Sequence, residues 1–236
     1  MEVGLPGNKK CVILIQARIN STRLPGKILF NFFNDTIIER IIKIAKKTAN
    51  HKDIFIISGD KKKNNILLNL AKKNNIRIYF GNETNVFLRF KKFLKTNYAK
   101  KYEYVYRITA DNYLVQPKII KKMINDAKNK KKDYGFVKPL SHYAGEIISK
   151  KLFFKRSIIS KHAREHVTWD FRKNKKINSL QYSKKFMNLN HEKSVTLDTI
   201  KDLINMKIFE NKFKGLKSID NYKYLKKIQN DLWYNR

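Results

Sequence analysis

The chain has 236 residues, of which 42% are hydrophobic, and this length supports one or two domains with a substantial core. Basic residues dominate, with 53 Lys and Arg against 19 Asp and Glu and a formal net charge of +34. A run of about 18 apolar residues, which a transmembrane helix needs, does not occur. The single cysteine, Cys11, excludes an internal disulfide framework. We therefore expect a cytoplasmic protein with no membrane span.

The strong positive charge has two explanations. Nucleic-acid-binding proteins use such charge to contact phosphates. The chain is also crowded with Lys, Asn, Ile, Phe and Tyr, which A/T-rich codons encode, and few aromatic residues flank the lysine runs at 61–63 and 130–132. Because base stacking needs such aromatic side chains, we favour base composition over a nucleic-acid partner. Tight binding to random RNA in about 0.3 M salt would reverse this preference.

The first 130 residues alternate between two patterns. Continuous apolar runs predict buried strands, and apolar residues repeating every three or four positions predict amphipathic helices. The expected strands are 11–15, 53–58, 77–80 and 104–108. The expected helices cover 37–45, 66–71, 86–94 and 117–124. This alternation predicts a doubly wound α/β fold with right-handed crossovers.

The remainder of the chain is less regular. We expect strands at 146–149 and 194–197, helices at 151–160 and 162–172, a helix that begins at 199, and a terminal helix at 219–233. Thr199 and Asp202 have the spacing of a helix N-cap and its N3 acid. No linker or internal repeat interrupts the chain. The sequence therefore predicts one domain over 1–236, with an inserted or appended subregion at about 138–190.

A cationic loop follows the first expected strand. Its cations are Arg18, Arg23 and Lys27, and its short polar side chains are those of Asn20, Ser21 and Thr22. Backbone N–H groups and hydroxyls can orient a polyphosphate while the cations neutralise it. An ordinary basic surface loop is the alternative, but ligands of α/β sheets bind where the strands end, which favours phosphate binding. The loop is not a Walker A sequence, and no G-x-G-x-x-G occurs.

Two aspartates also follow expected strands. Asp111 closes the sequence Arg-Ile-Thr-Ala-Asp, and Asp198 follows the strand expected at 194–197. Mg²⁺ in nucleotide sites is held by one or two carboxylates together with substrate phosphates, so this pair could share one ion if the strands are neighbours. Each aspartate could instead start the helix after it. Sequence spacing leaves both interpretations open.

Five segments then combine into a family resemblance. In order, they are 15–27, 81–86, 107–111, 164–168 and 195–198 with Asp202. Together they resemble cytidylyltransferases of the spore-coat polysaccharide biosynthesis type, relatives of the synthetases of CMP-3-deoxy-manno-octulosonate and CMP-sialic acids. The resemblance implies a Rossmann-like, three-layer α/β/α nucleotidyltransferase fold of glycosyltransferase-A type with a mostly parallel sheet. It also implies that CTP and Mg²⁺ are required.

The resemblance implies roles for individual residues. Catalysis would depend on Arg18, Lys27 and Asp111, and the metal would be held by Asp111 and Asp198. The nucleotide would be bound by Ala17, Arg18, Asn20, Ser21, Thr22, Arg23, Lys27, Ser58, Asp60, Arg107, Thr109 and Ala110. The acceptor, in the subregion at 138–190, would be contacted by Glu146, Arg164, Glu165 and His166. We favour a contact role for His166 over that of a general base.

The function expected from the resemblance is transfer of CMP from CTP to an acidic sugar or phosphorylated acceptor, with release of pyrophosphate, in surface-glycan biosynthesis. The acceptor side departs from the family pattern, because Asn112-Tyr113 replaces Cys-Pro and Ala144-Gly145 replaces Gly-Leu-Asp.

A metal-dependent glycosyltransferase is disfavoured because Asp-x-Asp does not occur. An RNA-binding module would leave the ordered motifs unexplained. A homodimer is expected by analogy with relatives.

Overall fold

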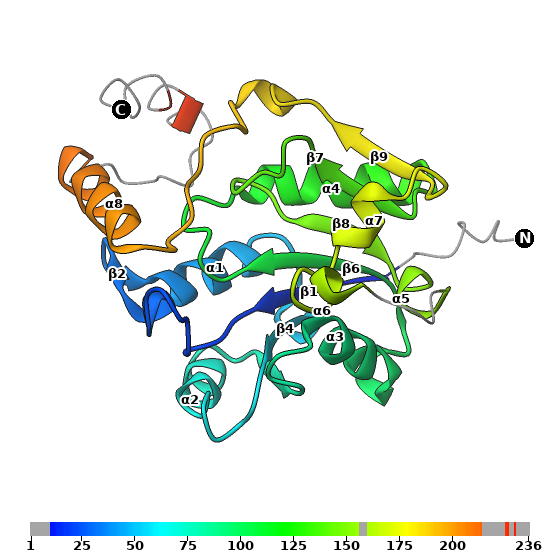
Figure 1. Ribbon diagram of the computed structural model, residues 1–236, viewed down its shortest axis with the longest axis horizontal. Coiled ribbons are helices and arrows are strands. Elements are labelled where there is room, and N and C mark those ends of the chain that lie inside the picture. Colours follow the sequence, from blue (N-terminus) through cyan, green and yellow to red (C-terminus); the bar gives the residue numbers. More distant parts are fainter. Residues whose placement is uncertain (1–9, 156–159, 214–224, 227–228, 230–236) are drawn as a thin grey trace, which may run out of the picture.

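A seven-stranded sheet with the order β5-β4-β1-β6-β8-β7-β9 forms the centre of the protein (Figure 1). The computed structural model describes residues 10–155, 160–213, 225, 226 and 229. The strands of the sheet are β1 (Lys10–Gln16), β4 (Ile54–Ser58), β5 (Arg77–Phe80), β6 (Tyr102–Thr109), β7 (Tyr134–Val137), β8 (Glu146–Ser149) and β9 (Ser179–Tyr182). β8 is antiparallel to β6 and β7, and the other neighbours are parallel, which confirms the mostly parallel sheet.

Helices cover both faces of this sheet. They are α1 (Ile37–Lys46), α2 (Ile66–Lys73), α3 (Val86–Lys95), α4 (Pro117–Asn129), α5 (Leu152–Lys155), α6 (Lys161–Glu165), α7 (Trp169–Lys173) and α8 (Ile200–Lys212). Ile13 and Ile15 of β1 share a core cluster with α1, α2 and α4. Val12 and Leu14 share the other cluster with α3, α5 and α7. These four side chains are fully buried, which stabilises the fold by roughly 1.5–3 kcal/mol each and completes three α/β/α layers.

Local signals fix the helix starts near the carboxyl ends of the strands. Thr36 and Glu39 form a capping box at α1, and Thr199 and Asp202 form one at α8. Pro117 occupies the first turn of α4, where its missing N–H costs nothing. Short elements complete the fold: the hairpin of β2 (Asn31–Phe32) and β3 (Asp35–Thr36), and the 3-10 helices η1 (Lys27–Leu29), η2 (His51–Asp53), η3 (Asn97–Ala99) and η4 (Phe186–Asn188). Within the described ranges, every helix is too short or too polar to cross a membrane.

The structure corrects two expectations in the second half of the chain and adds two strands. Residues 194–197 form no strand and pair with none of the described strands; Leu197 N donates to Asp111 O at 3.0 Å instead. The helix expected at 162–172 is two helices, because the backbone leaves the helical conformation at His166. β7 and β9 were not expected from the sequence pattern. Of the helix expected at 151–160, Leu152–Lys155 form α5, while 156–159 lie outside the described residues, as does most of 219–233.

Candidate active site

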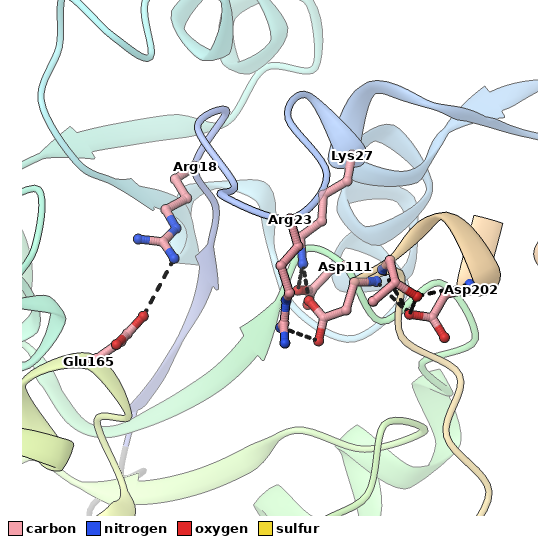
Figure 2. Close-up of polar contacts among 8 residues, drawn as sticks. Arg18, Arg23, Lys27, Asp111, Glu165 and Asp202 are labelled. Carbon is pink, nitrogen blue, oxygen red and sulfur yellow. Dashed lines mark hydrogen bonds and ion pairs between the residues drawn. The ribbon is translucent and has the colours of Figure 1, made fainter.

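The loop between β1 and η1 carries three cations to the carboxyl end of the sheet (Figure 2). Gly26 adopts the left-handed conformation, with a φ of 69°, and this turn starts η1 at Lys27. The side chain of Arg23 is exposed, whereas Lys27 is buried and only 8% exposed. Arg18 points to the other side of the loop, where its guanidinium lies 3.6 Å from the Glu165 carboxylate. The loop therefore presents cations in two directions.

Lys27 joins the two aspartates that lie far apart in the sequence. Its Nζ donates to Asp111 Oδ2 at 2.6 Å and to Asp198 Oδ1 at 2.5 Å (Figure 2). The Arg23 guanidinium lies 3.1 Å from the second oxygen of Asp198. Burial acts to raise the pKa of Asp198, but the hydrogen bond and charge of Lys27 and the charge of Arg23 outweigh burial and hold this pKa below its usual value. Asp198 is therefore ionised at neutral pH.

The cationic loop is held in place by the loops that follow β4 and β5. Ile19 N donates to the side-chain oxygen of Asn64 at 2.8 Å. Asn64 is completely buried, and its amide nitrogen contacts the Glu83 carboxylate at 3.3 Å. Asp60 N donates to the same carboxylate at 2.6 Å, and a Cβ at Gly59 would lie 1.8 Å from it. Because residue 59 is a glycine, the Glu83 carboxylate can approach the backbone there. Its contacts connect the loop after β5 to the loop after β4 and, through Asn64, to the cationic loop.

A cavity of about 490 Å³ lies between the cationic loop and the end of β6. Its volume falls in the range of small-molecule sites, about 300–1,000 Å³. It is lined by Gln16, Ala17, Arg18, Ser21, Thr22, Arg23, Lys27, Ile28, Val86, Arg89, Arg107, Thr109, Ala110, Asp111, Glu165, His166 and Asp198. Five of these residues are Arg or Lys and three are acidic. Such a cavity suits an anionic ligand whose charge is spread over several groups.

Arg89 is a cavity residue that the sequence did not reveal. It lies on α3 and is 1% exposed, and its guanidinium donates to the backbone oxygens of Asn82 and Glu83 at 2.8 Å each. Burial, opposed by the charge of Glu83 and assisted by that of Arg18, lowers the pKa of Arg89 to about 10. Arg89 therefore adds a positive charge to the wall of the cavity and supports the loop after β5.

A second, smaller cavity of about 210 Å³ adjoins the first at the two aspartates. Both cavities are lined by Arg107, Thr109, Asp111, His166 and Asp198. The second adds Asn112, Leu140, Ser141, His142, Ala144, Gly145, Glu146 and Thr196. Two ligands bound in these cavities would meet beside Asp111 and Asp198. This arrangement suits a reaction that joins two molecules.

Comparison with known proteins identifies the family. The family described as Cytidylyltransferase matches residues 12–235, almost the whole chain. The chain belongs to this family. The cytidylyltransferase is 29% identical over 180 residues to the spore coat polysaccharide biosynthesis protein SpsF of Bacillus subtilis (strain 168), covering 72% of this chain and 73% of that protein. It is therefore a nucleotidyltransferase, as the sequence motifs implied.

Solved structures agree with the observed fold. A cytidylyltransferase from Leptospira borgpetersenii serovar Hardjo-bovis (strain JB197) matches with a TM-score of 0.80 at 22% identity, covering 97% of this chain and 98% of that one. A CMP:2-keto-3-deoxy-manno-octonic acid synthetase complexed with CTP matches with a TM-score of 0.65 at 12% identity, covering 86% of this chain and 99% of that one. These likenesses confirm the Rossmann-like, three-layer nucleotidyltransferase fold.

Most of the residues expected from the sequence line the two cavities of the cytidylyltransferase. Four line neither of them: Asn20, Ser58, Asp60 and Arg164. Ser58 is completely buried at the end of β4, and Asp60 is an exposed residue of the loop coupled to Glu83. Asn20 and Arg164 are exposed. In these two motifs the adjacent residues Ser21 and Glu165 line the first cavity instead.

Glu146 is the centre of a buried polar network in the cytidylyltransferase. It is 2% exposed, and its carboxylate accepts from Arg107 at 2.6 Å, Thr168 at 3.0 Å and Arg172 at 3.4 Å. It also accepts from Tyr134, whose pKa burial and the Glu146 charge raise well above its usual value, so the phenol remains protonated. Arg107 also donates to Gln16 at 2.9 Å. Glu146 thus positions Arg107, which lines both cavities.

We expect Glu146→Gln to lower the free energy of unfolding by roughly 3 kcal/mol, because the change leaves Arg107, whose side chain is only 12% exposed, without its counter-charge. Urea unfolding would measure this loss. Glu192→Gln is the matched control, because Glu192 and its partner Lys184 are both about half exposed, and such pairs contribute at most about 1 kcal/mol. Equal stability losses in the two variants would contradict the role of Glu146.

Proposed function

We propose that this cytidylyltransferase transfers CMP from CTP to an acidic sugar or phosphorylated small molecule, releasing pyrophosphate, in surface-glycan biosynthesis. The observation that carries the proposal is the meeting of Lys27, Asp111 and Asp198 between a cationic cavity and a smaller polar one. Two similar proteins support the proposal: SpsF is a spore coat polysaccharide biosynthesis protein, and the structure of the CMP:2-keto-3-deoxy-manno-octonic acid synthetase is a complex with CTP.

The residues present fit a Mg²⁺ ion. Asp111 and Asp198 already share one cation, the Lys27 ammonium, and hard carboxylate oxygens are the ligands that Mg²⁺ prefers. Among the described residues, no cluster of three or more His, Cys, Asp or Glu forms a metal site. The two aspartates would therefore hold the ion together with phosphate and water oxygens. Bound there, Mg²⁺ would supply charge neutralisation to the phosphates.

The reaction needs little covalent chemistry from the protein. An acceptor oxygen attacks the α-phosphorus of CTP, and the bond from this phosphorus to the pyrophosphate oxygen breaks. Where the attacking oxygen is a hydroxyl, its proton passes to water; a phosphate oxygen attacks as the anion. Arg18, Arg23 and Lys27 would bind the triphosphate and stabilise the charge on departing pyrophosphate. Arg107 would orient both substrates from the shared wall. Positioning and electrostatic stabilisation account for most of the catalysis of phosphoryl-type transfers.

We expect pyrophosphate release with CTP and not with ATP, GTP or UTP, and only when an acceptor is present. The assay would present each of the four nucleotides with Mg²⁺ and a panel of octulosonic acid, nonulosonic acid and phosphorylated polyol acceptors. CTP-specific release supports the proposal. Release with another nucleotide, or none with any of the four, would overturn it.

A further inference from the structure

His142 is a half-buried side chain of the second cavity whose role the family motifs do not supply. It lines this cavity together with Asn112, Arg107 and the two aspartates. In the part of the chain that the structure describes, no residue hydrogen-bonds the imidazole, and neither ring nitrogen is sealed from solvent. An imidazole in this state has hydrogen-bonding capacity left for a ligand.

The backbone on both sides of His142 is fixed. The Ser141 hydroxyl contacts His191 Nδ1 at 2.5 Å and accepts from Tyr143 N at 3.1 Å. Gly145 N donates to the Tyr106 hydroxyl at 3.0 Å, and a Cβ at Gly145 would lie 2.1 Å from Arg107 O. The loop therefore lies close against β6. A rigid support of this kind holds a binding group at a defined place in a cavity.

His191 offers a contrast within the same structure. Both of its ring nitrogens are engaged, one with Ser141 and the other with Phe186 O at 2.8 Å, and the residue is 2% exposed. Its imidazole therefore serves the fold. His142 follows the same serine in the sequence, lines the second cavity and makes no hydrogen bond to the described residues. Of the two histidines, His191 is therefore structural, and His142 is available to a ligand.

The charge around His142 favours a hydroxyl as its ligand. Burial lowers the pKa of His142 below its usual value, although Asp111, Asp198 and Asp202 act to raise it. A neutral imidazole has one donor and one acceptor nitrogen, which complements a hydroxyl, itself both donor and acceptor. An anionic group of the ligand placed at His142 would be repelled by these three carboxylates unless it were paired with Arg107. The carboxylates therefore favour a neutral group at His142.

We propose that His142 is a specificity-determining residue that hydrogen-bonds a hydroxyl of the acceptor, and that the acceptor is polyhydroxylated. This inference rests on the proposed function, because it takes the second cavity as the acceptor site. The hydroxyl that His142 contacts is distinct from the attacking oxygen, which lies nearer the two aspartates. His142 thereby selects acceptors by a group away from the reacting centre.

The test compares His142→Ala and His142→Gln with the unmodified enzyme, using 3-deoxy-manno-octulosonate, N-acetylneuraminate and glycerol 3-phosphate as acceptors. We expect His142→Ala to raise the KM for the preferred acceptor about 3- to 10-fold, the loss of one hydrogen bond, while the KM for CTP changes less than about twofold. His142→Gln, which keeps a donor and an acceptor, is expected to restore part of the loss. An unchanged acceptor KM, or an equal change in the KM for CTP, would overturn the assignment.

Two further measurements separate a binding role from a structural one. His191→Gln is expected to lower the Tm by several degrees and His142→Gln to leave it unchanged, with His51→Gln as a control outside both cavities. The ring resonance of His142, recognised in histidine-labelled protein by its loss in His142→Gln, should shift when a panel acceptor is added. Destabilisation of His142→Gln, or no shift of the His142 resonance with any acceptor, would overturn the inference. Neither measurement requires turnover, so this result is distinct from a failure of pyrophosphate release, which would overturn the proposed function.

Discussion

Asp111→Asn is expected to lower kcat for CTP-dependent pyrophosphate release by at least about 100-fold, the size of effect seen when one electrostatic element of an active site is removed. Asparagine keeps the size of the side chain and removes its charge. Asp111 and Asp198 both accept from the Lys27 ammonium, and Asp111 lines both cavities. Its loss therefore weakens charge stabilisation where the two substrates meet.

The control for this prediction is Asp35→Asn. Asp35 pairs with a largely exposed lysine, Lys43, at 2.5 Å and lines neither cavity, so its replacement should leave kcat within about twofold. Steady-state kinetics with CTP varied and acceptor saturating would report kcat for both variants. Turnover by Asp111→Asn close to that of the unmodified enzyme would remove Asp111 from the reaction.

The elements that the sequence predicts well are those whose burial is encoded locally. The continuous apolar run at 11–15 is β1, and the helical spacing of Ile37, Ile38, Ile41 and Ile42 is α1. β7 contains Gly135, and β9 alternates weakly, so their strand conformation depends on tertiary pairing: β7 pairs with β8 and β9, and β9 is the edge strand. Val195 and Leu197 are buried in the core, but they pair with none of the strands that the structure describes. Burial alone therefore does not make a strand.

The site was predictable to the extent that it lies at strand ends. The loop after β1 leads to Lys27, Asp111 comes just after β6, and these neighbouring strands bring the two residues together. The contribution of Asp198 was inferred from a strand that does not exist; the hydrogen bond from Leu197 to Asp111 places it instead. Arg89 lies in the pattern of an amphipathic helix, and His142 in an irregular loop. Nothing in their local sequence marks them, because tertiary packing alone directs them to the cavities.

Lys27→Met is expected to lower kcat at least as strongly as Asp111→Asn and also to destabilise the fold. The change leaves Asp111 and Asp198 facing each other without the ammonium that both now contact, and Lys27 is nearly buried. Because both carboxylates are partly exposed, we expect a loss of roughly 1–3 kcal/mol rather than the full cost of an isolated buried charge. Thermal unfolding would show this as a fall in Tm of several degrees.

The same variant separates the two roles of the aspartate pair. If the carboxylates are built to hold a divalent cation, Mg²⁺ without CTP should raise the Tm of Lys27→Met more than that of the unmodified protein, because a ligand that binds only the folded state stabilises it. In the unmodified protein the Lys27 ammonium competes for the same oxygens. Lys43→Met, which breaks an exposed pair, should show no such difference. Equal responses of Lys27→Met and the unmodified protein to Mg²⁺ would mean that the pair serves only to anchor Lys27.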